Sequence, residues 1–333
     1  MNSERRAFLI CLGLIFVLAG SLVFSLFAGR YEMTKTEIFL SLFRQNENIR
    51  INTVIWKIRV PRIVMSMAIG AGLSVAGVAM QAMFGNPLVS PHVLGVSHAA
   101  GFGAALGLLI LNNFLHIQII SALFGFLGMF ITYSISRRRG QSNVLMLILS
   151  GIIVAAVFQA LTSLVKFVAD PEQKLPSITY WLMGSLAGSS WPDAQKCVPV
   201  VFVSITVLWL IRWRLNIISL REEEAISLGV NIRQTRTIVI ICTTIITAAS
   251  VSFCGVIAFV GLAVPHFARM LCGNDHKYLL LACCISGAIF LLIIDTIARS
   301  ATATEIPLSI LTAIIGAPVF AFLLHKTGGA WDD

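Results

Sequence analysis

Apolar segments about as long as a bilayer is thick recur along almost the whole chain, and they constrain its fold more than any other feature. A helix needs about 20 mostly apolar residues to cross the hydrocarbon core of a membrane. Backbone groups in lipid must satisfy their own hydrogen bonds, which favours helices. We therefore expect an all-α polytopic membrane protein in which residues 1–333 form a single transmembrane domain. About ten spans are predicted, near residues 7–28, 63–84, 94–111, 117–136, 144–168, 194–211, 236–254, 256–271, 278–297 and 306–324.

The composition agrees with a membrane protein. Hydrophobic residues make up 57% of the chain and charged residues 12%, whereas a soluble domain carries about 25% charged residues. In a soluble protein, the net charge of +9 would point to nucleic acid. Here the basic residues fall in short loops, so we expect no nucleic-acid partner. The first apolar run, Ala7–Ala28, is long enough to span, and we interpret it as a retained helix that starts in the cytoplasm.

The basic clusters follow the alternation expected of cytoplasmic loops, which are rich in Lys and Arg. If the N-terminus is cytoplasmic, the cytoplasmic side receives Arg5–Arg6, Arg137–Arg139, Arg212, Arg214, Arg221, Arg233, Arg236, Lys277 and Lys326. An even number of spans then leaves both termini in the cytoplasm. One external segment, residues 29–62, departs from the rule because it holds seven basic and three acidic residues. Long loops tolerate such a bias; alternatively, an acidic partner binds there from outside.

Two further segments are predicted to form short helices that do not span. Residues 177–187 place Tyr180 and Trp181 where aromatic side chains favour the outer membrane interface. Residues 217–230 form an amphipathic cytoplasmic helix with an acidic patch at Glu222–Glu224 and a stop at Gly229. This second helix is either a solvated loop helix or a surface offered to a soluble partner.

Several features that would carry chemistry are missing from the sequence. No acidic residue lies near the middle of a predicted span between Arg62 and Leu324, although carriers driven by ion gradients usually need such a group. No GxxxxGK[ST] motif is present for ATP hydrolysis. The six histidines have no metal-ligand spacing and the seven cysteines form no CxxC pair. We expect no enzyme, no cofactor and no metal, and an energy source outside the chain.

Small residues and helix breakers predict how the spans pack. Glycines in Gly70–Gly77 and Gly101–Gly107 would let helix backbones approach closely. Breaks are predicted at membrane boundaries around Asn86–Pro91, Gly255, Pro265 and Pro318. Non-helical backbone at membrane depth is tolerated where protein covers it or where it faces a water-filled pathway.

A series of short motifs, in order along the chain, resembles the FecCD-type permeases, which are membrane subunits of ATP-binding-cassette importers for iron–siderophore complexes, haem and vitamin B12. The motifs cover nearly the whole chain from about residue 50. In its first half they are Arg59-Val-Pro-Arg62, Gly70-Ala71-Gly72-Leu73, Gly77, Gln81, Asn86-Pro87-Leu88 and Leu94-Gly95. In its second half they are Trp181–Leu186, Leu228-Gly229-Val230, Gly255–His266, Asp295, Arg299, Glu305-Ile306-Pro307 and Gly316–Phe320.

The resemblance implies an architecture and a set of partners. It implies a type II importer permease with about ten helices per subunit, in the cytoplasmic (inner) membrane of a bacterium or archaeon. A second permease subunit completes the pore, as a homodimer or as a pair of related permeases. Two cytoplasmic ATPase subunits supply the energy, and an extracytoplasmic binding protein delivers the substrate.

The resemblance also implies roles for particular residues. Arg59, Arg62 and Arg299 would receive acidic residues of the binding protein. Spans 144–168 and 306–324 would line the path. The coupling helix, which sits on the ATPase, would comprise Ser219, Leu220, Glu222, Glu223, Glu224, Ala225, Leu228 and Gly229. The inner gate would comprise Asn86, Pro87, Leu88, Ser142 and Asn143.

From the sequence we expect the permease subunit of an ATP-driven importer that moves an iron–siderophore chelate into the cytoplasm. The same importer type could carry a corrinoid, haem or an oxyanion such as molybdate. A secondary transporter driven by an ion gradient is an alternative of a different class, as is a channel. Uptake that survives loss of the proton gradient would separate the importer from the gradient-driven carrier.

Overall fold

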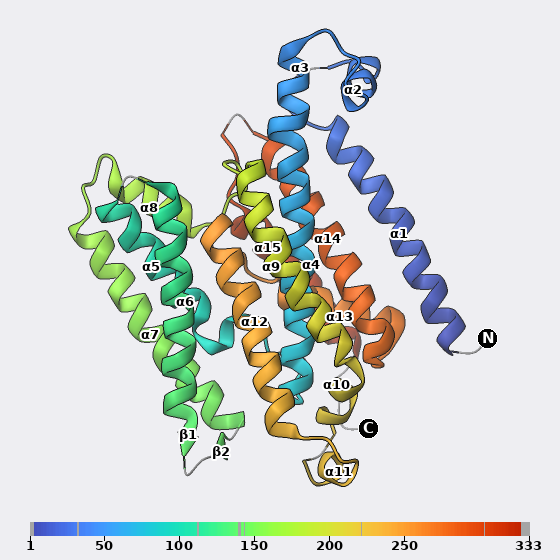
Figure 1. Cartoon of the computed structure of the whole chain (residues 1–333), viewed down its shortest axis with the longest axis vertical. Coiled ribbons are helices and arrows are strands. Elements are labelled where there is room, and N and C mark those ends of the chain that lie inside the picture. Colours follow the sequence, from blue (N-terminus) through green and yellow to red (C-terminus); the bar gives the residue numbers. More distant parts are fainter. Residues whose placement is uncertain are drawn as a thin grey trace.

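The computed structural model describes residues 3–31, 33–111, 113–138, 141–142, 144–220, 222–302 and 304–327, and it is a bundle of helices (Figure 1). Within these residues, seven helices are long and apolar enough to cross a membrane, and three shorter apolar helices accompany them. Together they coincide with the ten predicted spans, so the predicted fold class is confirmed. The ten are α1 (Ser3–Phe27), α4 (Val60–Phe84), α5 (Val96–Ile110), α6 (Phe114–Ser136), α7 (Val144–Val168), α9 (Trp191–Leu210), α12 (Ile232–Cys254), α13 (Val260–Cys272), α14 (His276–Ser300) and α15 (Leu308–Thr327).

Shorter elements connect these helices. They are α2 (Lys35–Leu42), α3 (Ile49–Thr53), the π-helical turn η1 (Val54–Arg59), the 3-10 turn η2 (Pro91–Leu94), α8 (Lys174–Leu182), α10 (Arg212–Ile218), α11 (Glu222–Ser227) and the antiparallel pair β1 (Arg137–Arg138) and β2 (Gln141–Ser142). Figure 1 shows α2, α3 and α8 at one end of the bundle and α11 with the β pair at the other. We call these the α2 end and the α11 end.

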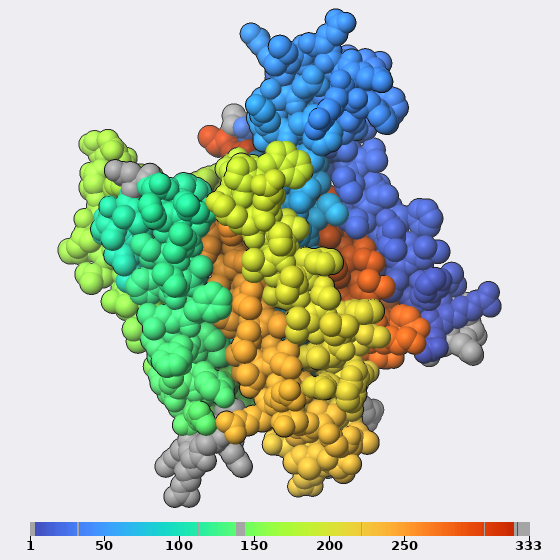
Figure 2. All heavy atoms as spheres, viewed as in Figure 1, coloured from blue at the N-terminus to red at the C-terminus, as the bar shows by residue number. Residues whose placement is uncertain are grey.

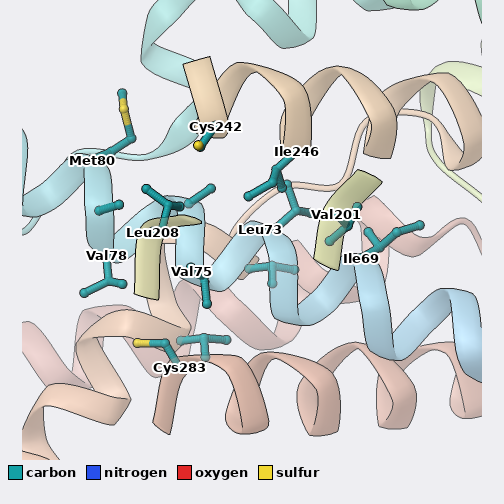
Figure 3. Packing of buried hydrophobic residues seen from close by; sticks show 14 of the residues in the cluster. Ile69, Leu73, Val75, Val78, Met80, Val201, Leu208, Cys242, Ile246 and Cys283 are labelled. Atoms are coloured by element: carbon teal, nitrogen blue, oxygen red, sulfur yellow. The ribbon is translucent and has the colours of Figure 1, made fainter. Parts of the chain in front are cut away.

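Helix α4 lies at the centre of the bundle (Figure 1) and is buried over most of its length. Figure 3 shows its apolar side chains packed against residues of neighbouring helices, such as Val201 on α9 and Ile246 on α12. Small residues allow this packing, as predicted. A Cβ atom at Gly70 would lie 2.8 Å from Leu291 Cβ and would overlap the Gly287 carbonyl group, so α4 and α14 meet backbone to backbone.

The outer helices have the opposite character. In α1, 17% of the apolar 18-residue stretch is buried, against 83% of the corresponding stretch in the continuous helix Ile49–Phe84. Helices α6, α7 and α9 also expose many large apolar side chains. Apolar surface of this extent marks contact with lipid or with another chain.

Two of the predicted helix breaks are confirmed and two are wrong. Helix α4 ends at Gly85 in the left-handed region (φ 58°), and α12 ends before Gly255 (φ 72°). Pro265 and Pro318, in contrast, lie inside α13 and α15, which continue through them. Proline removes one backbone donor, but membrane helices tolerate it because neighbouring groups and local adjustments satisfy the freed carbonyl.

The break between α12 and α13 is covered by other parts of the chain. The Ser185 N–H donates to the Cys254 carbonyl (2.8 Å), and the Leu308 N–H donates to the Gly184 carbonyl (2.9 Å). Gly184 itself has a left-handed φ of 76°. The ends of α8 and α12 and the start of α15 are therefore joined by backbone hydrogen bonds, which satisfies non-helical backbone inside the bundle.

The two short helices differ in extent from their predictions. The helix predicted at 177–187 is α8, which begins at Lys174 and ends at Leu182, just before left-handed Gly184. The single helix predicted at 217–230 is wrong, because α10 ends at Ile218 and α11 begins at Glu222. The Asn216 amide donates to the Asp275 carboxylate and accepts from the His276 N–H (both 2.9 Å), which fixes α10 against the start of α14.

Candidate functional site

A cluster of buried charges lies at the α2 end. Arg59 ends η1, Arg62 lies in the first turn of α4 and Arg299 lies in the last turn of α14. Their exposed fractions are 4%, 5% and 8%. Two acidic residues complete the cluster: Asp295, which is completely buried on α14, and half-buried Glu305, which precedes α15. The structure therefore brings together the three arginines that the sequence grouped by resemblance.

Arg62 forms the central ion pair of this cluster. Its Nε lies 2.9 and 3.0 Å from the two Asp295 oxygens, its Nη2 lies 2.8 Å from Asp295 Oδ1, and its Nη1 lies 2.9 Å from Glu305 Oε1. The local pair between Asp295 and Arg299 is looser, with 4.0 Å between Asp295 Oδ2 and Arg299 Nε. A buried carboxylate needs a partner of this kind, because an isolated buried charge is very unfavourable.

Arg59 and Arg299 bind the C-terminal end of α1. Arg59 donates to the carbonyls of Leu26 (2.5 Å) and Tyr31 (3.2 Å), and Arg299 donates to the Ser25 carbonyl and hydroxyl. The last carbonyls of a helix lack intrahelical donors and carry the negative end of its dipole. The two guanidinium groups therefore attach α1 to α4 and α14.

A cavity of about 210 Å³ lies beside this cluster. Its lining includes four arginines, Arg30, Arg59, Arg62 and Arg299, and one acidic residue, Glu305. The excess of positive charge suits an anion or a carboxylate. The role of Arg59, Arg62 and Arg299 in docking stays a prediction. In this structure all three side chains form hydrogen bonds or ion pairs with other groups of the same chain. A carboxylate of a partner would therefore have to replace some of these interactions.

The segment between α1 and α4 forms an ordered basic surface above this cavity. The Thr34 N–H and hydroxyl donate to the Glu37 carboxylate at 2.7 and 2.8 Å, which caps α2 and holds the pKa of Glu37 below its ordinary value. The Trp56 indole donates to the Ser41 carbonyl (2.8 Å), joining α2 to η1. We define the α2 surface by its exposed basic residues, Lys35, Arg44, Arg50 and Lys57.

At the α11 end, the segment predicted to couple to an ATPase exposes both apolar and acidic groups. Ile226 and Leu228 are 62% and 59% exposed, whereas Ala225 is buried and adds nothing to the surface. The Ser219 hydroxyl donates to the Asn216 carbonyl at the end of α10, and Gly229 turns the chain with a φ of 75°. We define the α11 surface by Leu220, Glu222, Glu223, Glu224, Ile226 and Leu228.

The predicted gate residues lie in two separate turns. The turn after α4 contains Asn86, whose side-chain oxygen accepts from the Leu88 N–H (2.8 Å), and it leaves Leu88 52% exposed. The Gln81 side chain donates to the Val89 carbonyl (3.4 Å) and accepts from Arg269 (3.0 Å), which holds this turn against α13. Ser142 pairs with Arg137 in the β pair. Asn143 lies outside the described residues.

Comparison with known proteins identifies the family. The profile of the FecCD transport family matches residues 15–326. The chain belongs to this family. The molybdate import system permease protein MolB of Haemophilus influenzae is 39% identical over 321 residues, which cover 95% of each chain. An iron chelatin transport system permease protein of Helicobacter pylori is 37% identical over 288 residues, 86% of this chain and 87% of that protein.

Solved structures support the same fold. A structure described as an inward-facing conformation of a metal-chelate type ABC transporter matches with a TM-score of 0.87 at 38% identity, over 95% of this chain and 99% of that one. PsaBC from Streptococcus pneumoniae, solved with a Fab, matches with a TM-score of 0.59 at 18% identity, over 86% and 95% of the two chains, which shows the fold alone. The expected importer permease architecture and the resemblance to the FecCD family are both confirmed.

Proposed function

We propose that this chain is the permease subunit of an ATP-driven importer and that it moves an iron–siderophore chelate into the cytoplasm. The observation that carries the proposal is a FecCD-family bundle with a cationic cavity at one end and an exposed apolar and acidic surface at the other. A relative from Helicobacter pylori is named for iron chelatin transport at 37% identity. In this proposal, the cavity end faces outward and both chain termini are cytoplasmic.

The proposed energy source is a pair of separate cytoplasmic ATPases that bind the α11 surface. Two features support this assignment. No acidic residue lies near the middle of a predicted span between Arg62 and Leu324 to couple an ion gradient. Exposed Ile226 and Leu228 lie beside three glutamates on a short helix that faces water, a combination suited to a groove with apolar walls and basic edges.

The proposed path lies between two copies of this chain. Helices α7 and α15 would line it, with the turn at Asn86–Leu88 and residues 142–143 near its inner end. Exposed apolar residues on both helices support this arrangement, such as Ile152 on α7 and Phe322 on α15, because apolar surface in a membrane bundle faces either lipid or a partner chain. The binding protein would deliver substrate at the α2 end through acidic groups.

A molybdate-like oxyanion is the second candidate substrate. The Haemophilus influenzae relative named for molybdate import is 39% identical over 95% of both chains. The cavity at the α2 end is lined by four arginines, which suits an oxyanion as well as a carboxylate. A corrinoid or haem would use the same importer type, and a cobalamin import permease of Halobacterium salinarum is 39% identical over 274 residues.

Uptake in cells tests the substrate assignment. A strain that lacks only this permease should lose uptake of a labelled iron–siderophore chelate, and the wild-type chain should restore it. Labelled molybdate, haem and cobalamin are measured in parallel. Restoration of molybdate uptake alone would overturn the iron assignment and leave the importer assignment in place.

A substitution on the α11 surface tests the coupling assignment. Leu228→Asp places a charge on a 59% exposed apolar side chain, so we expect the chain to fold but to lose the co-purifying ATPase and ATP-dependent uptake. Ile49→Asp is the matched control, because Ile49 is 79% exposed at the opposite end. Normal ATPase recovery with Leu228→Asp would contradict the assignment.

A further inference from the structure

A groove runs along one face of the bundle, with α12 as its floor and α6 and α9 as its walls. Figure 2 shows α12 between α6 and α9, and α12 packs against both. At the α2 end, the Gln118 side chain of α6 donates to the Asp193 carboxylate of α9 (3.1 Å), which closes the top of the groove. Below this bond lie two adjoining cavities of about 260 and 290 Å³, and Ile245 lines both.

The chemistry of the groove changes along its length. The lower cavity is lined mainly by aliphatic side chains, such as Val203, Val207 and Ile238. Its one hydroxyl, that of Ser204, donates to the Val200 carbonyl within α9. The upper cavity is also mainly apolar, but Gln118, Lys196 and Ser252 add polar groups near the α2 end. The groove is therefore apolar along most of its length, and its cationic group lies at one end. An amphiphile, with an apolar chain and a polar headgroup, has the same division.

The length of the upper cavity along α12 is close to the thickness of the hydrocarbon layer in one leaflet. On α12 the floor of the upper cavity extends from Phe253 to Ile245, a rise of about 12 Å at 1.5 Å per residue. One leaflet contributes about half of a hydrocarbon core that is about 30 Å thick. Trp191 begins α9 just above the cavity, where interfacial tryptophans are expected. An acyl chain that enters beside α9 would follow the groove inward.

Lys196 places a cation at the α2 end of the groove. It lies in the second turn of α9 and is exposed. Asp193, three residues before it, already accepts bonds from Gln118 and Ser190, and no ion pair with Lys196 occurs among the residues that the structure describes. A lysine near a membrane interface extends its ammonium group toward the polar layer, where anionic groups are found.

From this geometry we propose that the groove binds a phospholipid of the leaflet at the α2 end, with one acyl chain between α6 and α9 and its phosphate at Lys196. The lipid fills apolar volume that the chain itself leaves open and supplies the anion that Lys196 lacks. The site lies apart from the charge cluster and from the α11 surface. The proposal therefore depends only on the chain spanning a bilayer, and not on which substrate it transports.

Binding of phosphatidylglycerol to the delipidated, detergent-purified protein tests the proposal. Native mass spectrometry counts bound lipids, and a melting curve reports the stabilisation that a ligand of the folded state gives. We expect the wild-type protein to retain phosphatidylglycerol and its Tm to rise. Lys196→Gln should weaken retention about five-fold, the effect of one basic residue at an anionic membrane surface. Lys166→Gln, near the same end of α7, should leave retention unchanged.

A second pair of variants tests the groove itself. Ala122→Phe fills the upper cavity and should abolish lipid retention, whereas Leu123→Phe enlarges the adjacent exposed side chain of α6 and should not. Ala249→Leu fills the floor more mildly and serves if the phenylalanine prevents folding. Equal lipid retention by the groove-filling variants and Leu123→Phe would overturn the proposal. A changed oligomer mass with Ala122→Phe would assign the groove to a partner helix and would also overturn it.

Discussion

At the residue scale, the ion pair between Arg62 and Asp295 indicates that the buried carboxylate of Asp295 has a structural role. Asp295 is completely buried, five residues before the end of α14, and both of its oxygens accept hydrogen bonds from Arg62. A carboxylate held in this way joins two helices. A coupling site for an ion gradient would instead have to exchange its partner during each cycle. The buried acid is therefore compatible with an external energy source.

Asp295→Asn tests this structural role. The substitution leaves Arg62 buried with only Glu305 as a charged partner, and removing one member of a buried ion pair costs about 3–5 kcal/mol. We expect a lower unfolding temperature for the detergent-solubilised protein. Glu172→Gln makes the same chemical change on an exposed carboxylate and should leave the temperature unchanged. Equal stability of the two variants would contradict a structural role for the pair.

The sequence indicated this cluster only in part. Asp295 and Arg299 are four residues apart on a helix, so their proximity follows from spacing alone. Arg62 and Asp295 are separated by 233 positions, and no local pattern reveals that α4 packs against α14 at this height. The sequence also could not show that Arg59 and Arg299 bind carbonyls of α1, because those acceptors are backbone atoms.

At the element scale, the crossing of α4 and α14 depends on glycine. Gly70 and Gly287 face each other, and a Cβ atom on either one would overlap the other's carbonyl group. Without a hydrophobic driving force between helices in lipid, such close contact supplies much of the packing energy. The central position of α4 therefore follows from its small residues as much as from its apolar ones.

Gly70→Ala tests this crossing. The added methyl group forces the helices apart, and overpacking of this kind costs about 1–3 kcal/mol. Gly13→Ala is the control, since among the described residues no atom outside the same stretch of α1 lies within 4 Å of the Cβ position at Gly13; alanine also favours a helix there. We expect a lower Tm for Gly70→Ala and an equal or higher Tm for Gly13→Ala. The opposite order would contradict the close packing.

The ten helices could be predicted because apolar runs and the breakers between them mark each one in the sequence, including the three that are shorter than a full span. The bounds of the shorter helices could not be predicted in the same way. The amphipathic pattern over residues 217–230 continues across the gap between α10 and α11, so it predicts a single helix. The bonds of Asn216 to the start of α14 are long-range contacts that this local pattern does not reveal. Pro265 and Pro318 predict helix breaks, but α13 and α15 continue through them; a membrane helix tolerates proline where neighbouring groups satisfy the freed carbonyl. Local sequence patterns therefore predicted that these helices exist better than they predicted where the helices end.

At the scale of the whole molecule, the two ends carry different chemistry. The α2 end has the basic α2 surface and a cavity lined by four arginines, and the α11 end has exposed apolar residues beside glutamates. Partners on the two ends would thus be recognised by different forces: long-range charge at the α2 end and apolar burial at the α11 end.

Charge reversal on the α2 surface tests recognition at that end. Arg50 is exposed, so Arg50→Glu should slow association of the binding protein without unfolding the chain. The effect should be largest at low salt, because screening shortens the reach of surface charges. Arg233→Glu reverses an exposed charge at the other end of the molecule and should have no effect. Association rates of Arg50→Glu that match the wild type at every salt concentration would contradict the assignment.

The most direct test of the account is solute uptake into lipid vesicles that contain the permease, its ATPase and its binding protein. If the energy comes from outside this chain, uptake will require ATP on the α11 side and will continue after an ionophore removes every ion gradient. Vesicles that contain the permease alone should accumulate nothing. Accumulation by the permease alone, driven only by an ion gradient, would contradict the account.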